Sequence, residues 1–312
     1  MPIPRISARD LLDPARPGHA AAREALRLGA EQTGFLTLHD TPITPSRVLQ
    51  VLAAYRAFFR LPDAQKTLID MARTGANRGW GAPGGEQVDP DANPDYKQVF
   101  DCGFELAAGD PLTARNLSVY APNQWPRNPP EFAPLVRSYY TQATGFALHL
   151  LRALAGVVGQ DPDYFAHRFD RPMALLRGNY YPVRPDWATE RDFGIAAHTD
   201  YGCLTLLATD GRAGLEVRSL AGDWVPVTAE PGCFIVNFGE MFEIWTAGRV
   251  RATPHRVIGG PEERISVPLF FNPNYDTDIS PPGSATPITA GSHLARRFDE
   301  TYLHMKSGMA GA

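Results

Sequence analysis

The chain has 312 residues, of which 44% are hydrophobic and 21% are charged, and its formal net charge is -4. This balance is typical of a globular protein, and a negative chain without a dense Lys/Arg run lacks the electrostatic footprint of a nucleic-acid or membrane-surface binder. We therefore expect a small-molecule substrate. The N-terminus shows no secretory signal, and the three cysteines show no close pairing, which together favour a reducing, cytoplasmic location.

The first 125 residues are expected to be mostly helical. Apolar residues at helical spacing predict one helix over 20–33 and a second over 44–62, with a short strand at 35–38 between them. Asp63 is a candidate cap for a third, short helix. The order of these signals predicts a helical N-terminal region built around one strand.

A long loop and a long helix follow. Residues 73–94 are rich in Gly, Pro, Asn and Asp, which indicates a loop of the kind that often serves as a lid or binding segment. Residues 130–159 form the longest helical pattern, and we expect this helix to support a sheet from outside.

The second half of the chain has a different texture, with short apolar or alternating runs separated by Gly, Pro, Asp and Asn. Short strands at such spacing favour an antiparallel sandwich or barrel. A closing helix is expected over 291–305, and one domain over 1–312 is the economical interpretation. The candidate strands are 174–181, 204–208, 215–219, 233–238, 255–258 and 265–271.

Two histidines and one aspartate form a candidate metal site. In an extended segment, His198 and Asp200 share a face because they are two residues apart. His255 begins a later strand-like run and can supply a second imidazole. Two imidazoles and one carboxylate are the ligand set of non-haem Fe(II) oxygenases, and they leave positions open for co-substrate and dioxygen.

The ligand types alone leave alternatives open. A bare His-x-Asp pair is usually a solvated turn or a structural pair, but strand-like apolar sequence surrounds this one, and burying a carboxylate there is costly unless it is paired or metal-bound. Zinc also accepts His and Asp ligands. A zinc hydrolase, or a metal-binding jelly roll that senses a small ligand, therefore stays possible at this point.

The larger pattern resembles the isopenicillin N synthase-like branch of the Fe(II)/2-oxoglutarate-dependent dioxygenases. The resemblance implies a double-stranded β-helix, a distorted cupin-like jelly roll, over 173–275, giving an α+β, β-rich fold with flanking helices. The N-terminal half resembles the family through residues 95–101 and 123–126. The matching core motifs are Asn179-Tyr180-Tyr181-Pro182, His198-Thr199-Asp200-Tyr201-Gly202, Gly214-Leu215-Glu216-Val217, Asn237-Phe238-Gly239-Glu240, His255-Arg256-Val257 and Arg264-Ile265-Ser266.

The resemblance also implies the chemistry. Members of the family bind Fe(II) and chelate it with 2-oxoglutarate, which dioxygen converts to succinate and carbon dioxide while a small organic substrate is hydroxylated, desaturated or cyclised. The iron and the co-substrate supply this reactivity, and the protein supplies ligation, orientation and a dry pocket.

A co-substrate anchor is predicted on the last strand. Arg264 and Ser266 face the same side of it, and a guanidinium with a hydroxyl can hold the distal carboxylate of 2-oxoglutarate. By resemblance, Tyr181 and Asn179 are their partners from an earlier strand, although Asn179 could equally be a polar core residue. Some members of the branch keep this pattern without 2-oxoglutarate, so an iron oxidase of the isopenicillin N synthase type remains the alternative.

Substrate contacts follow from strand alternation. If Asn179 and Tyr181 point inward, so does Arg177, and an inward arginine favours an anionic or hydrogen-bond-accepting substrate. The opposing interpretation is an arginine that faces solvent or pairs with Asp or Glu. Phe270 is in phase with Arg264 and faces the cavity, unless it is plain core.

Candidate lids are the loop 73–94 and the final helix with Phe298 and Tyr302. Lys97 lies in a family-like stretch, but Gln98 follows it where the family usually has an acidic residue. The remaining histidines on helical stretches away from the metal motifs are interpreted as structural or surface residues. These are His149, His167 and His293.

Overall fold

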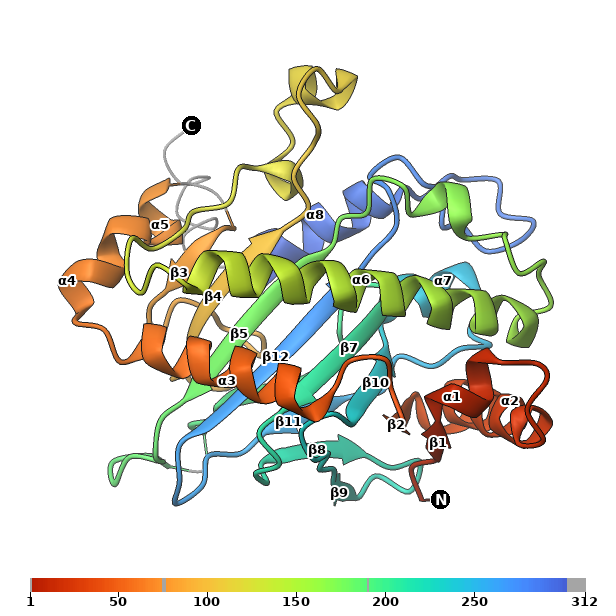
Figure 1. The fold of residues 1–312 in the computed structure, drawn as a ribbon, viewed down its shortest axis with the longest axis horizontal. Helices are drawn as coiled ribbons and strands as arrows, with labels where there is room; N and C mark the ends of the chain where they lie inside the picture. Colours follow the sequence, from red (N-terminus) through yellow and green to blue (C-terminus); the bar gives the residue numbers. More distant parts are fainter. Residues whose placement is uncertain (1, 75–76, 190, 302–312) are drawn as a thin grey trace.

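Two β-sheets form the centre of the protein in the computed structural model, which describes residues 2–74, 77–189 and 191–301 (Figure 1). The larger sheet has the strand order β1-β2-β10-β7-β12-β5-β4-β3, and the smaller has the order β6-β11-β8-β9. All strand pairs are antiparallel except β1 with β2. The large sheet contains β1 (Arg5–Ser7), β2 (Phe35–His39), β3 (Gly79–Gly81), β4 (Gln98–Gly103), β5 (Leu175–Tyr181), β7 (Leu204–Thr209), β10 (Phe234–Phe238) and β12 (Arg264–Phe271). The small sheet contains β6 (Ile195–His198), β8 (Leu215–Arg218), β9 (Trp224–Pro226) and β11 (His255–Val257).

Helices α3 and α6 lie across one face of the large sheet (Figure 1). The side chain of Thr44 caps α3 by accepting a hydrogen bond from the backbone N–H of Arg47, and proline follows at the first helical position. The apolar stripe expected on α6 is buried against the sheet at Tyr139, Phe146 and Leu150. The helices are α1 (Ala8–Leu12), α2 (His19–Leu28), α3 (Pro45–Phe59), α4 (Asp63–Lys66), α5 (Met71–Thr74), α6 (Phe132–Val157), α7 (Glu240–Trp245) and α8 (Ala290–Thr301).

The alternation of side chains along β12 determines which of its residues face the small sheet and the candidate site. Ile265, Val267, Leu269 and Phe271 pack into the main core on the helix side. Arg264, Ser266 and Phe270 therefore face the opposite side, toward the small sheet. On β7 all six residues are buried, because both faces of this central strand are covered.

A second, smaller core lies between the two sheets. Strands β2, β5, β7 and β10 of the large sheet contribute to it, and so do β8 and β11 of the small one. Two packed antiparallel sheets with helices over one outer face are the arrangement predicted from the sequence, and the β-rich jelly-roll fold class is confirmed. The cluster consists of Phe35, Tyr181, Leu207, Leu215, Val217, Val227, Ala229, Ile235 and Val257.

Most predicted elements are present, with shifts at their ends. The helix expected over 20–33 ends as α2 at Leu28 and continues as a π-helical turn, Gly29–Thr33. Pro62, not Asp63, occupies the cap position of α4. The described part of the closing helix is α8, and residues 302–305 of that prediction lie outside the described residues.

Several short elements were not predicted. The expected loop 73–94 contains β3, and β1, β9 and α7 are likewise three to six residues long. Segments of this length are too short for a hydrophobic period to show. The N-terminal region contributes β1, β2, β3 and β4 to the large sheet as well as its helices.

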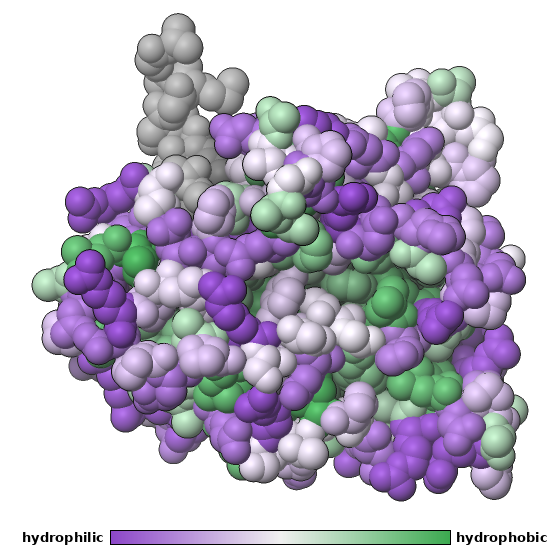
Figure 2. All heavy atoms as spheres, turned by 45° about the horizontal axis from the view of Figure 1, so that its top comes forward, coloured by the Kyte–Doolittle hydropathy of each residue, from purple (hydrophilic) through white to green (hydrophobic). Residues whose placement is uncertain are grey.

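Within the described ranges, no helix combines the length and the apolar character needed to cross a membrane. On the face drawn in Figure 2, polar residues predominate and apolar ones appear as separate areas among them.

Candidate metal centre

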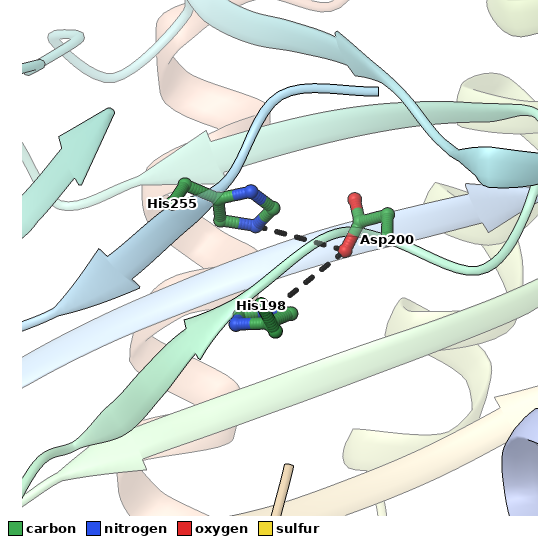
Figure 3. Close-up of side chains that lie close together, drawn as sticks. All are labelled: His198, Asp200 and His255. Carbon is green, nitrogen blue, oxygen red and sulfur yellow. Dashed lines mark ion pairs between the residues drawn. The ribbon is translucent and has the colours of Figure 1, made fainter. Parts of the chain in front are cut away.

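His198, Asp200 and His255 converge at the edge of the small sheet (Figure 3). His198 ends β6 and His255 begins β11, and the two are directly opposite in the strand pairing. Their Nε2 atoms lie 3.9 Å and 3.7 Å from Oδ1 of Asp200, and their ring centroids are 4.3 Å apart. The three candidate donor atoms all lie within 4.8 Å of one another, so one cation could contact all three.

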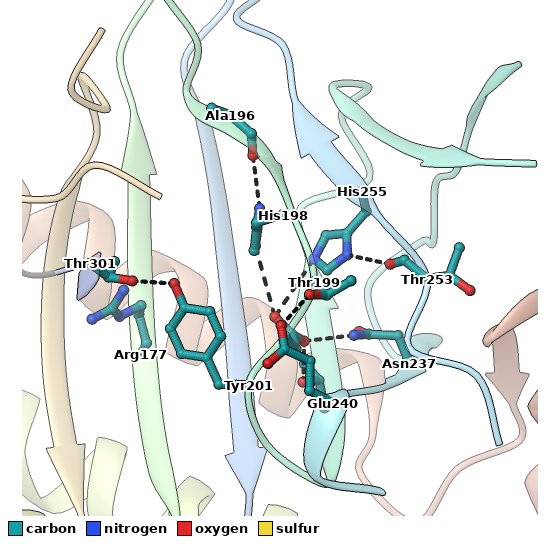
Figure 4. Close-up of polar contacts among 12 residues, drawn as sticks. Arg177, Ala196, His198, Thr199, Tyr201, Asn237, Glu240, Thr253, His255 and Thr301 are labelled. Carbon is teal, nitrogen blue, oxygen red and sulfur yellow. Dashed lines mark hydrogen bonds and ion pairs between the residues drawn. The ribbon is translucent and has the colours of Figure 1, made fainter. Parts of the chain in front are cut away.

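The opposite ring nitrogens of both histidines are engaged by the backbone (Figure 4). Nδ1 of His198 lies 2.8 Å from the carbonyl oxygen of Ala196, and Nδ1 of His255 lies 3.1 Å from that of Thr253. Because a carbonyl oxygen can only accept, each Nδ1 carries a hydrogen, and Nε2 is the ring atom left to face the other two side chains. This tautomer suits a metal ligand whose orientation the protein fixes.

The protein likewise hydrogen-bonds to only one carboxylate oxygen of Asp200. Its Oδ2 accepts hydrogen bonds from the hydroxyl of Thr205 and from Nδ2 of Asn237, the latter at 2.6 Å. Burial would raise the pKa of Asp200, but His255, His198 and these two hydrogen bonds together hold it below its usual value. The carboxylate is therefore ionised, and Oδ1 faces the two imidazoles.

Burial lowers the pKa of His198 to about 3, with a further contribution from neighbouring His255. The imidazole is accordingly neutral near pH 7. Its Nε2 lone pair is available without the loss of a proton, as metal ligation requires.

The loop that carries Asp200 is fixed by the start of α7, which sequence reasoning missed. The backbone N–H of Glu240 donates to the carbonyl of Asp200 at 2.8 Å, and the hydroxyl of Thr199 donates to the Glu240 side chain. Gly239 is required at this approach, because a Cβ there would lie 2.5 Å from the Asp200 carbonyl oxygen. The Asn237–Glu240 motif was quoted in the sequence, but its spatial role needed the turn into α7.

The predicted co-substrate residues lie together on β5 and β12. Arg264 is opposite Tyr181, and Ser266 is opposite Asn179. The guanidinium carbon of Arg264 lies 5.1 Å from the centroid of the Tyr181 ring. Among the described residues, Nη1 of Arg264 and Oδ1 of Asn179 are buried without a hydrogen-bond partner. Unpaired buried polar atoms of this kind are rare, and a bound carboxylate would satisfy the Arg264 donor.

A cavity of about 100 Å³ adjoins the His-Asp-His group. His198, Asp200, Arg177, Asn179 and Phe270 all line it, so Phe270 and Arg177 point inward as alternation predicts. Apolar side chains make up much of the remaining wall, including Val88, Val119, Met173, Leu175, Leu294 and Phe298.

Arg177 belongs to a buried charge network, defined here as Arg177, Asp101, Glu86, Lys97 and Asp95. Its Nε and Nη2 donate to the two Asp101 oxygens at 2.8 Å and 2.6 Å, and Nη1 donates to Glu86 at 3.1 Å. Lys97 lies 2.8 Å from Glu86 and 2.7 Å from Asp95. The inward arginine expected to attract an anion is thus already paired with two carboxylates.

The network shifts the pKa values of its members. Burial alone would raise the pKa of Glu86, but Arg177 and Lys97 outweigh it and lower this pKa to about 2. Burial raises the pKa values of Asp95 and Asp101, despite their cationic neighbours. Sequence reasoning missed Glu86 and Asp101. The pairing of Asp101 with Arg177 across β4 and β5 would have required the strand register.

The two predicted lid segments both line the cavity and touch each other. Glu86 and Val88 come from the loop, Phe298 comes from α8, and the backbone N–H of Gln87 donates to the Thr301 carbonyl at 3.2 Å. Tyr302 lies outside the described residues.

Two sequence expectations need correction or explanation. His293 is structural but not remote from the metal motifs, because its Nε2 lies 3.0 Å from the carbonyl oxygen of Tyr201, next to Asp200.

Gln98, where the family usually has an acidic residue, has a local role: its side-chain oxygen accepts from Lys66 at 2.9 Å and from Trp80 at 3.0 Å.

Known proteins are similar over nearly the whole chain. The model of the 2OG-Fe(II) oxygenase superfamily matches residues 172–273, and that of the non-haem dioxygenase in morphine synthesis N-terminal region matches 3–128. A homoarginine-6-hydroxylase of Arabidopsis thaliana is 32% identical over 269 residues, covering 85% of this chain and 80% of the relative. The crystal structure of a full-length Neurospora crassa protein in complex with alpha-KG and thymine matches with a TM-score of 0.82 and 28% identity, over 96% of both chains. The crystal structure of JOX2 with 2OG, Fe and JA matches with a TM-score of 0.78 and 25% identity, over 98% of this chain and 88% of JOX2.

Proposed function

This chain belongs to the Fe(II)/2-oxoglutarate-dependent oxygenase superfamily and is a 2-oxoglutarate-dependent dioxygenase, and from that premise we propose that His198, Asp200 and His255 hold its iron. One observation carries the assignment. Nε2 of each histidine and Oδ1 of the aspartate converge, while Nδ1 and Oδ2 of the same side chains are engaged by the protein. Two imidazoles with an ionised carboxylate fit Fe(II) by ligand type and number. When bound, the iron supplies the activation of dioxygen.

We propose that Arg264 and Ser266 bind the distal carboxylate of 2-oxoglutarate, with Tyr181 and Asn179 beside them. Nη1 of Arg264, buried and without a hydrogen-bond partner in the described part of the chain, supports this assignment, because a carboxylate is the partner a guanidinium prefers. The family and its named relatives use 2-oxoglutarate, so the oxidase without 2-oxoglutarate and the metal-binding jelly roll are set aside.

For the second half of the reaction, we propose hydroxylation of a small organic substrate in the adjoining cavity, with release of succinate and carbon dioxide. The names of several relatives that are at least 30% identical, all homoarginine-6-hydroxylases, support hydroxylation over desaturation or cyclisation. Phe270 and the apolar wall exclude water from the substrate, and the paired Arg177 holds the cavity wall in place.

The test begins with binding. The purified protein is loaded with Fe(II) under nitrogen, and its iron content and 2-oxoglutarate affinity are measured before oxygen is admitted and succinate is followed. His198→Ala should bind no iron, and Arg264→Ala should raise the KM for 2-oxoglutarate steeply while iron stays bound. The exposed His167 provides the matched control, His167→Ala, which should change neither quantity. Full iron occupancy in His198→Ala would refute the ligand assignment, and an unchanged KM in Arg264→Ala would refute the anchor.

A further inference from the structure

Asn77 carries a buried side-chain amide to which no described residue hydrogen-bonds. It precedes β3 and lines the same cavity as His198 and Asp200, and it is 3% exposed. Among the residues the structure describes, neither its Oδ1 nor its Nδ2 has a hydrogen-bond partner. Leaving both a donor and an acceptor unpaired in a protein interior is unfavourable and rare. A bound ligand that hydrogen-bonds to this amide would remove the unfavourable burial of both atoms.

Contacts of residues 77–79 hold the backbone of Asn77 in place. The guanidinium of Arg78 donates to the carbonyl oxygen of Asn77 itself at 2.8 Å and also to the carbonyl of Val119. Gly79 has a φ of 96°, and a Cβ there would lie 2.2 Å from the carbonyl oxygen of Ile69. Because these contacts hold the chain, the Asn77 amide stays at the cavity wall in a fixed place, as a recognition group requires.

A second asparagine in the same wall shows what a structural amide looks like. Asn272 is also 3% exposed and lines the cavity. Its Oδ1 accepts from the backbone N–H of Cys203 at 2.9 Å, and its Nδ2 donates to the carbonyl of Met173 at 3.2 Å. The fold supplies hydrogen-bond partners to both the oxygen and the nitrogen of the Asn272 amide. The described residues supply none to either atom of the Asn77 amide.

The charged groups of the cavity point to a neutral ligand. Glu86, Lys97 and Arg177 line it, and each is already in ion pairs within the buried charge network. Arg78 also lines it, and its guanidinium donates to the backbone carbonyls of Asn77 and Val119. An ionised substrate would have to compete with these pairs for its counter-charge. The Asn77 amide offers an NH2 donor group and a carbonyl acceptor, neither of them charged.

We propose that Asn77 recognises the prime substrate, and that this substrate is a small neutral molecule with a carbonyl and an N–H side by side, as in a lactam, an imide or an oxo-substituted nitrogen heterocycle. Nδ2 donates to the carbonyl and Oδ1 accepts from the N–H, so the two hydrogen bonds run in parallel. The rings of Phe270 and Phe298 in the same wall suit a flat ring. The inference rests on the proposed function, because it takes this cavity to be the substrate site beside the iron.

The test compares probes that differ only at the N–H. The protein with Fe(II) and 2-oxoglutarate, kept under nitrogen, is titrated calorimetrically with glutarimide and uracil and with their N-methylated forms, N-methylglutarimide and 1,3-dimethyluracil. At least one N–H probe should bind about tenfold or more tightly than its methylated form, because an unmet polar group in the site is costly. Asn77→Ala should remove this difference. Equal affinity for each pair, no binding by any probe, or an unchanged preference in Asn77→Ala would each overturn the proposal.

A stability measurement separates recognition from a structural role. Asn77→Ala should leave the Tm of the protein without probe unchanged or higher, since no hydrogen bond to a described residue is lost. Asn272→Ala should lower the Tm, because two backbone groups lose their partner. An equal drop in Tm for both variants would make Asn77 structural and overturn the proposal. Iron and 2-oxoglutarate binding are measured in the same samples: their absence in the wild type refutes the proposed function and this inference with it, whereas normal binding without probe discrimination refutes this inference alone.

Discussion

The His-Asp-His group and the buried charge network both contribute residues to the wall of one cavity, yet they use their polar atoms in opposite ways. In the His-Asp-His group each side chain gives one atom to the protein and leaves another facing its neighbours. In the network Arg177 donates from three nitrogens to two carboxylates, and Lys97 contacts one oxygen of Glu86 and one of Asp95. Half-engaged side chains mark a place for a ligand, whereas fully engaged ones mark part of the scaffold.

The largest expected effect is on metal binding. Asp200→Asn keeps the shape of the side chain but removes the charge that faces His198 and His255, so we expect iron binding and succinate formation to fall to background. The unfolding midpoint of the metal-free protein should change little by comparison. Iron content by elemental analysis and thermal melting check the two halves of this prediction, and an Asp200→Asn protein that retains one iron per chain would contradict it.

A mutation in the buried charge network should instead lower the free energy of unfolding. Arg177→Met leaves Asp101 and Glu86 buried without their shared counter-charge, and removing one partner of a buried pair costs about 3–5 kcal/mol of the free energy of unfolding. Urea denaturation measures this loss. The control is Arg152→Met, because Arg152 pairs with Asp163 at the surface and such pairs contribute at most about 1 kcal/mol. Similar losses in the two variants would show that the network is not the scaffold we describe.

A smaller effect is expected from the residue that orients Asp200. Thr205→Val removes the hydroxyl that donates to Oδ2, and we expect iron affinity to fall by about 10- to 100-fold, as for other residues that hold a metal ligand. Thr209 lies on the same strand, and its hydroxyl donates to the Ala229 carbonyl at 2.7 Å, away from Asp200. Thr209→Val should reduce stability and leave iron affinity unchanged. Equal iron affinities in the two variants would remove the role given to Thr205.

The smallest effect is a pH dependence from Glu86. Its pKa is lowered from 4.5 to about 2 in the folded protein, so its stabilising contribution is complete above the unfolded value and is lost as the pH falls from 4.5 toward 2. The difference in unfolding free energy between the wild type and Glu86→Gln should therefore shrink by about 1–2 kcal/mol from about pH 5 to about pH 3. Urea titrations at both pH values measure it. If the difference in unfolding free energy between the two proteins grew on acidification, the effect would have the opposite sign and would contradict the ion pairs of Glu86.

Local spacing explains what the sequence could predict about fold and site. Two residues separated by one share a face of a strand, and this alone places His198 near Asp200 and aligns Arg264, Ser266 and Phe270. His255 was the candidate for the distant second imidazole because it begins a later strand-like run, and the resemblance to known oxygenases then included it among the matching motifs. These predictions depend on the period of a strand and on motifs, both of which are properties of short segments.

The positions of the remaining site residues depend on contacts between segments far apart in the sequence, and no hydrophobic period reveals such contacts. Asp101 meets Arg177 only because β4 and β5 pair in one register, across 76 positions. Glu86 and Asn77 lie in the loop around β3, where no period constrains the direction of a side chain. The contact of α7 with the Asp200 carbonyl likewise follows from a turn that only the folded backbone shows.

The alternation along β12 also bears on how this enzyme can diverge. One inserted or deleted residue between Arg264 and Phe270 would exchange the two faces of the strand, turning a guanidinium toward the helices and apolar side chains toward the small sheet. New specificities can therefore arise by replacing residues on this strand, but changes of length are confined to connecting segments outside the paired strands, where an added residue disturbs no such phase.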